Sequence, residues 1–202
     1  RRNSMISGFG WSALALFFGY LALFFWGSAM AAQAAGKPVW LFGPATGRDR
    51  LAAMGFRAAF ALTFFGPLLW LAVPMLHKVD PLWTEGRAVL LGQIGVFVAG
   101  LGAMVAFAAQ MSMGSSWRVG VVGGETGALV SGGLYRVSRN PAFVGQFSLL
   151  AGVGLAIPSL PTLLALLLLI GVVVDDAIVV RESILRHMSG EADGAGLAGV
   201  DL

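Results

Sequence analysis

Long stretches without a charged side chain dominate the pattern of polar and apolar positions along the chain. Four such stretches stand out, at residues 3–36, 58–76, 88–117 and 140–174. A helix needs about 20 mostly apolar residues to cross the hydrocarbon core of a bilayer. The first three stretches therefore predict one membrane span each, at about 11–32, 58–76 and 89–110.

The fourth stretch is long enough for two helices. Pro158 and Pro161 lie near its middle, and two prolines three residues apart remove backbone donors and favour a turn. This pattern predicts a helical hairpin with spans at about 142–157 and 162–180. Because helices satisfy their own backbone in lipid, the predicted fold class is all-α: a polytopic membrane protein with five transmembrane helices in a single domain, residues 1–202.

Composition supports a membrane protein and excludes several other classes. Of the 202 residues, 57% are hydrophobic and 11% are charged, whereas soluble domains are about 45–50% apolar and about 25% charged. The high apolar and low charged fractions exclude a soluble enzyme and a disordered tail, and the absence of cysteine excludes a disulfide-built module. Its two histidines, His77 and His187, provide no zinc or haem ligand set. The first span is long and aromatic for a signal peptide, which is the alternative interpretation of that segment.

Basic residues predict the orientation. With five spans, one side of the membrane receives nine lysines and arginines and the other side receives four. The nine are Lys37, Arg48, Arg50, Arg57, Arg118, Arg136, Arg139, Arg181 and Arg186. Cytoplasmic loops carry the excess of Lys and Arg, so we expect the N-terminus outside and the C-terminus in the cytoplasm.

Polar chemistry gathers first in residues 114–145, ahead of the fourth span. This stretch is rich in glycine and contains Arg118, Arg136 and Arg139. Glycine lets the backbone approach a ligand closely, and arginine pairs with carboxylates. Pro141 is suited to the first turn of a helix, whose free N–H groups would face the cytoplasm. The alternative is a solvated loop whose arginines anchor it at the membrane surface.

A second polar group follows the fifth span. At about 100° per residue, Asp175, Glu182 and Arg186 fall along one line of a helix. Carboxylates such as Asp175 and Asp176 are costly near a bilayer unless they face protein, water or a cation. A ligand or an arginine of the preceding loop would explain them, and a helix end that has reached water is the alternative.

Three segments carry a resemblance to known enzymes. The stretch 133–145 reads GLYRVSRNPAFVG and resembles the G-x-Y-x-x-x-R-H-P-x-Y-x-G signature of isoprenylcysteine carboxyl methyltransferases and the related phospholipid methyltransferases. Residues 114–118, GSSWR, resemble their G-x-S-W-R stretch, and residues 181–190, RESILRHMSG, resemble E-E-x-x-L-x-x-x-F-G. Asn140 stands where the family usually has His, Phe143 where it has Tyr, and Arg181 where it has the first Glu.

The resemblance implies a membrane methyltransferase that uses S-adenosylmethionine, with the cofactor region at about residues 114–190 facing the cytoplasm. The acceptor would be a lipid-like or prenylated small molecule that enters from the surrounding membrane lipids. Independently of the resemblance, the singly scattered basic residues predict no nucleic-acid partner, and the lack of a ligand set predicts no metal. The Ala- and Gly-rich composition favours a bacterial inner membrane as the location. By position, Arg139 and Glu182 would be catalytic. The cofactor-binding residues would be Tyr135, Arg136, Arg139, Asn140, Pro141, Phe143, Gly145 and Glu182.

Two other functions compete with this interpretation. A sterol-reductase-like enzyme shares the hairpin and uses NADPH, but it is normally longer and has an aromatic, lysine-containing tail. A non-catalytic membrane scaffold is the other alternative, and cofactor binding distinguishes all three. The acceptor stays open between a carboxylate, a thiol and an amine. Gln93, Gln110 and Gln146 either face a substrate tunnel or, as the better interpretation, hold helices together.

Overall fold

The structure is a computed structural model that describes residues 2–40, 47–80, 82, 89–119 and 130–172. Within these ranges the chain is helical and contains no β-strand, so the all-α prediction is confirmed there. The long helices are α1 (Arg2–Ala35), α2 (Gly47–Ala72), α3 (Val89–Met113) and α4 (Pro141–Ala156), followed by the helix Leu160–Val172. Short 3₁₀ turns are η1 (Pro74–Lys78), η2 (Gly114–Ser116) and η3 (Gly133–Arg136).

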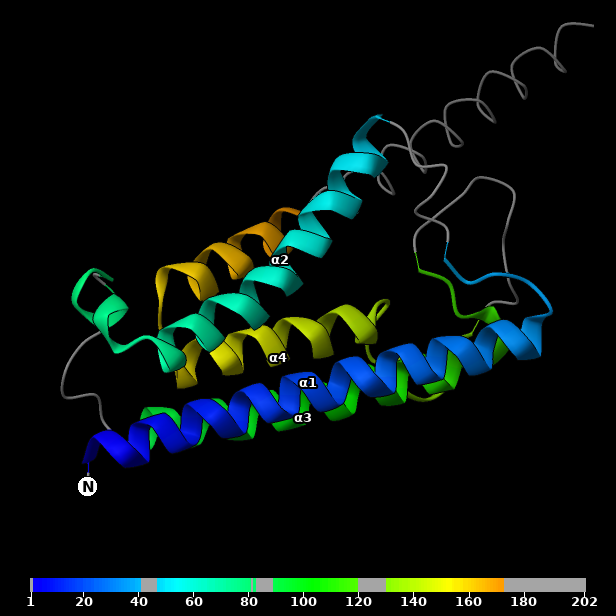
Figure 1. The fold of residues 1–202 in the computed structure, drawn as a ribbon. Coiled ribbons are helices and arrows are strands. Elements are labelled where there is room, and N and C mark those ends of the chain that lie inside the picture. Colours follow the sequence, from blue (N-terminus) through cyan, green and yellow to red (C-terminus); the bar gives the residue numbers. More distant parts are fainter. Residues whose placement is uncertain (1, 41–46, 81, 83–88, 120–129, 173–202) are drawn as a thin grey trace, which may run out of the picture.

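Successive helices run in alternating directions along one bundle (Figure 1). We name its two ends by the segments that lie there. The site end holds residues 36–40, 114–119 and 131–140, and the hairpin end holds residues 73–80 and 157–160. The helices α1 and α3 run toward the site end, and α2 and α4 run back from it (Figure 1).

In the part of the chain that the structure describes, three helices are long and apolar enough to cross a membrane, by length and composition. Their apolar segments are Gly8–Ala35, Arg50–Ala72 and Leu90–Ser116. Large apolar side chains on them face outward, with Phe18 61% and Phe97 72% exposed, which suits a lipid environment. The helix α4 has 16 residues and rises about 24 Å, less than the hydrocarbon thickness of about 30 Å. The hairpin predicted at 142–157 and 162–180 is present as far as residue 172, the last described residue. Because its first helix is shorter than the hydrocarbon thickness, the count of five membrane crossings stays a prediction.

The bounds of α2 differ from the predicted span at 58–76. The helix ends at Ala72 because Pro74 follows two residues later. The residue before a proline is pushed out of the helical region, and Val73 has φ −124° and ψ 85°. At its other end α2 begins at Gly47, because Arg50 and Arg57 interrupt the apolar pattern without interrupting the helix.

The backbones of α3 and α4 touch along what we call the small-residue seam, formed by Gly95 and Gly102 of α3 and Gly145 and Gly152 of α4. A Cβ added to Gly152 would lie 2.6 Å from the carbonyl oxygen of Gly95, and one added to Gly102 would lie 2.6 Å from that of Gly145. Real Cβ atoms essentially never approach another atom within 3.0 Å. Small residues let membrane helices pack at backbone distance, so the seam fixes the register of α3 against α4.

Buried amides tie both helices to α1. The amide of Gln146 on α4 donates to the Tyr20 hydroxyl at 2.8 Å, and that of Gln110 on α3 donates to the Phe24 carbonyl at 2.9 Å. Both glutamines are at most 4% exposed, and in these positions they hold helices together. Gln93 is exposed.

Asp80 joins the two connections at the hairpin end, a contact that the sequence analysis did not anticipate. Its carboxylate accepts hydrogen bonds from the backbone N–H groups of Leu160 at 2.8 Å and Leu82 at 2.9 Å. The side chain is 4% exposed. Since Leu160 is the first residue of its helix, Asp80 places a carboxylate at a helix N-terminus, where it satisfies a free donor and complements the helix dipole.

Replacing Gly152 with alanine should destabilise the protein, because the new Cβ would overlap α3. Overpacking of this kind costs typically about 1–3 kcal/mol, seen as a lower unfolding temperature in detergent. Gly154→Ala on the same helix is the matched control, since its Cβ would meet its nearest neighbour, Leu166 Cδ1, at 3.5 Å. Equal unfolding temperatures for the two variants would contradict the seam.

Asp80→Ala should lower the free energy of unfolding by about 1–3 kcal/mol, since the Leu160 and Leu82 amides both lose their acceptor. Denaturant or thermal unfolding in detergent measures the change. Lys78→Ala, at an exposed position of η1 in the same connection, should have little effect. The capping role is refuted if both variants unfold alike.

Candidate functional site

The segment after α3 turns sharply at Gly114 and is anchored by Trp117. Gly114 has φ +49°, a conformation that favours glycine, and its carbonyl accepts from the Trp117 N–H at 3.1 Å. The Trp117 side chain is 7% exposed, and its Nε1–H donates to the Ser28 Oγ of α1 at 3.2 Å. The glycine of the GSSWR stretch thus makes the turn, and the tryptophan ties it to α1.

Ser28 and Gln110 complete a buried polar group with Trp117, which we call the Ser28 cluster. The Gln110 Nε2 donates to the Ser28 Oγ at 3.0 Å as well as to the Phe24 carbonyl. Ser28 is fully buried and Gln110 is 2% exposed. Within the described residues, the buried Gln110 Oε1 has no hydrogen-bond partner.

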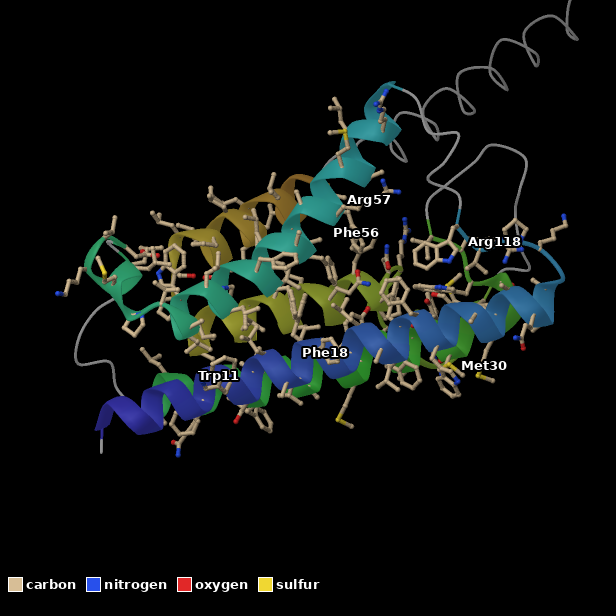
Figure 2. The ribbon with its side chains drawn as sticks, viewed as in Figure 1. Trp11, Phe18, Met30, Phe56, Arg57 and Arg118 are labelled. Carbon is tan, nitrogen blue, oxygen red and sulfur yellow. The ribbon has the colours of Figure 1, made fainter. Side chains whose placement is uncertain are left out.

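The segments that follow α1 and α3 pair with each other at the site end. The Val119 N–H donates to the Val39 carbonyl at 2.8 Å, and Trp40 forms an isolated parallel bridge with Val119. Between these anchors lies Arg118, half-buried, whose Nη1 donates to the carbonyls of Ser115 at 2.9 Å and Trp117 at 2.8 Å. Figure 2 shows Arg118 at the same end of the bundle as Met30, with Trp11 toward the other end.

The GLYR turn places Tyr135 against α3. Gly133 has φ +58°, which explains the glycine that opens this motif. The Tyr135 hydroxyl donates to the Ala109 carbonyl at 3.2 Å. Burial raises the pKa of Tyr135 above its ordinary value of 10.0, which favours the protonated phenol that donates this hydrogen bond.

The helix α4 begins with Pro141, as the sequence predicts, and Asn140 caps it. The Asn140 Oδ1 accepts from the Phe143 N–H at 3.2 Å, and the Asn140 N–H donates to the Ser138 Oγ at 3.3 Å. Fewer N–H groups are free here than the sequence predicts. Pro141 has no N–H group, and the N–H group of Phe143 is bonded to Asn140. The remaining N–H group of the first turn belongs to Ala142, which is 5% exposed.

Two arginines flank this capped start. Arg136 and Arg139 are exposed, and neither forms a hydrogen bond or an ion pair within the described ranges. Phe143 lies beside them, half-buried, and its ring meets that of Phe56 on α2 edge-on at 6.1 Å. Figure 2 shows Phe56 next to Arg57 on the part of α2 nearer the site end. The site end therefore combines two arginines, Arg136 and Arg139, that have no partner among the described residues, with the aromatic faces of Phe56 and Phe143.

The structure brings most of the predicted site residues together. Gly145 differs, because it is buried in the small-residue seam, where a Cβ would lie 2.7 Å from the Ala106 Cα. Its described contacts are those of helix packing. Glu182 lies outside the described residues, as do the predicted acidic group at Asp175 and Asp176. Tyr135, Arg136, Arg139, Asn140, Pro141 and Phe143 gather at the site end.

In the sequence, Arg118 stands out only as part of GSSWR and was not among the predicted site residues, and Ser28 was not predicted either. A single serine in an apolar helix gives no signal of its own, and its role depends on the packing of α1 against α3. Among the described residues no group of three or more His, Cys, Asp or Glu side chains could hold a metal ion.

Asn140→Ala should lower stability by about 1 kcal/mol, since the Phe143 N–H loses its cap. Asn140→Ser should retain most of that stability, because a serine oxygen also caps helices well. Unfolding of both variants in the same detergent tests the difference. An alanine variant as stable as the serine variant would contradict the cap.

The comparisons with known proteins identify a family. A family model described as phospholipid methyltransferase matches residues 91–190, about half of the chain, from the first turn of α3 past the end of the described hairpin. The searches found no matching curated protein and no matching solved structure. Over residues 91–190, the chain belongs to the phospholipid methyltransferase family.

Proposed function

We propose that the protein transfers a methyl group from S-adenosylmethionine to a lipid-like acceptor at the site end of the bundle. The observation that carries the proposal is the meeting of two motifs. The GSSWR stretch follows α3 and the RNP turn opens α4, both lie within the matched residues 91–190, and both arginine-bearing segments lie at one end of the bundle (Figure 1).

The residues at this end fit part of the proposed cofactor. S-adenosylmethionine carries a carboxylate, which could pair with the guanidinium groups of Arg136 and Arg139, since neither has a partner within the described ranges. Its adenine ring suits an aromatic face such as that of Phe143. Its amine and sulfonium call for carboxylates, and the resemblance assigns that role to Glu182, which lies beyond the described residues.

The bound cofactor would supply an activated methyl group on its sulfonium. The protein's own contribution would be to orient two reactants and to exclude water. Arg139 would hold a carboxylate at the start of α4, and the half-buried phenol of Tyr135 would keep the preceding turn against α3. Phe56 and Phe143 would form the apolar side of the site, where a lipid-like acceptor can approach from the bilayer.

We place the site end in the cytoplasm. Among residues with described side chains, Lys37, Arg50, Arg118, Arg136 and Arg139 lie at or next to that end, whereas Lys78 lies at the hairpin end. The positive-inside rule favours this orientation. It would put the N-terminus outside and the C-terminus in the cytoplasm, where a soluble cofactor is available.

Calorimetry in detergent tests cofactor use. The purified protein should bind S-adenosylhomocysteine and not NADPH. Arg139→Ala should weaken binding about 10- to 100-fold, the range expected for a lost charged hydrogen bond, and Glu182→Gln should also weaken it. Because Arg139 is exposed, its variant should unfold at the wild-type temperature. Arg50→Ala, at another exposed arginine, is the control.

Each other result has a definite meaning. Binding of NADPH alone would point to the reductase-like alternative, and binding of neither compound would favour a scaffold. Incubation with a lipid extract and methyl-labelled S-adenosylmethionine should then give a labelled lipid, whose identification names the acceptor. A protein that binds the cofactor but labels no lipid would refute the lipid-like acceptor.

A further inference from the structure

The guanidinium of Arg118 is already oriented by the backbone around it. The two N–H bonds of its Nη1 are directed to the carbonyls of Ser115 and Trp117. Its Nε and Nη2 form the other edge of the planar group and make no hydrogen bond in the described part of the chain. Such an edge presents two parallel donors that match a carboxylate or a phosphate.

This orientation distinguishes Arg118 from the other arginines of the site. Arg136 and Arg139 are exposed and have no partner in the described ranges, so they lose conformational entropy when a ligand orders them. Arg118 is half-buried and held at one edge. A preoriented donor pair binds with less entropic cost and greater directionality.

The position of Arg118 depends on Trp117, and Trp117 depends on α1. The indole donates to the fully buried Ser28 Oγ at 3.2 Å, and its ring meets that of Phe24 edge-on at 6.1 Å. Ser28 in turn accepts from the Gln110 amide at 3.0 Å. A continuous path of buried contacts therefore leads from the interior of α1 to the carbonyl that orients the guanidinium.

The Gln110 side-chain amide is held in one orientation by its contacts with α1. Its Nε2 serves two acceptors on α1, while its buried Oε1 has no partner in the described residues. An unsatisfied buried acceptor is unfavourable, so the two hydrogen bonds that the Nε2 donates must determine the orientation of the amide. Gly27 provides the room, because a Cβ there would lie 3.0 Å from the Gln110 Nε2.

We infer that Arg118 is a further anion-binding residue of the site, and that Ser28 is a positioning residue that holds it through Trp117. The inference rests on the proposed function, and the anion is a carboxylate or phosphate group. That group belongs either to the methyl donor or to the lipid acceptor, and the kinetics below separate these two sources.

Steady-state methyl transfer with varied S-adenosylmethionine and varied lipid extract provides the test. Arg118→Lys keeps the charge and loses the two-pronged edge, so we expect the KM of the ligand that carries the anion to rise about 10- to 100-fold. The KM of the other ligand should stay within about twofold of the wild-type value. Whichever KM rises identifies the source of the anion.

Ser28→Ala and Trp117→Phe each remove the same Nε1–Oγ hydrogen bond. Each should raise that same KM about 3- to 10-fold with kcat within about twofold. Because both changes remove one hydrogen bond, the KM of the double variant should be no higher than the larger of the two single-variant KM values. Ser12→Ala is the control, because Ser12 is exposed and bonds to the Gly8 carbonyl of its own helix. If Ser28→Ala does not fold, Trp117→Phe still tests the same bond.

An unchanged pair of KM values in Arg118→Lys would overturn the anion-binding role. Single variants that lower only the unfolding temperature and leave both KM values unchanged would overturn the positioning role. A wild-type protein that neither binds S-adenosylhomocysteine nor transfers a methyl group would overturn the proposed function, and the inference with it.

Discussion

The direct backbone contact between α3 and α4 is the constraint on which the rest of the structure depends. Because Gly102 lies against Gly145, and Gly95 against Gly152, the two helices pack antiparallel in one register. That register sets the C-terminal end of α3 beside the N-terminal end of α4. The GSSWR stretch and the RNP turn are well separated in the sequence, and the seam brings both to the same end of the bundle.

The first helix anchors the segments of the candidate site as well as the bundle. It lies outside the matched residues 91–190, yet Ser28 bonds to Trp117 and Tyr20 bonds to Gln146. Polar partners inside an apolar bundle are unfavourable when they are separated, so these bonds fix α1 against α3 and α4. The site end is thereby built on three packed helices and not on loops alone.

Proline and glycine made part of the fold readable from the sequence, because their effects are local. Pro141 begins α4, and Pro158 follows its end. The role of Asp80 could not be read in this way, since its partner Leu160 is distant in the chain. The same holds for Ser28, whose importance comes from a helix that packs against it, and for Asn140, where the resemblance to a motif suggested chemistry and the structure shows a cap.

Hydrogen exchange measured by mass spectrometry in lipid nanodiscs, with and without S-adenosylhomocysteine, tests the central claim most directly. If the cofactor binds at the site end, backbone amides in residues 114–119 and 133–143 should exchange more slowly with the ligand, while residues 73–80 and 157–160 at the hairpin end should be unchanged. Protection confined to the hairpin end, or no protection in the two site segments, would contradict the account.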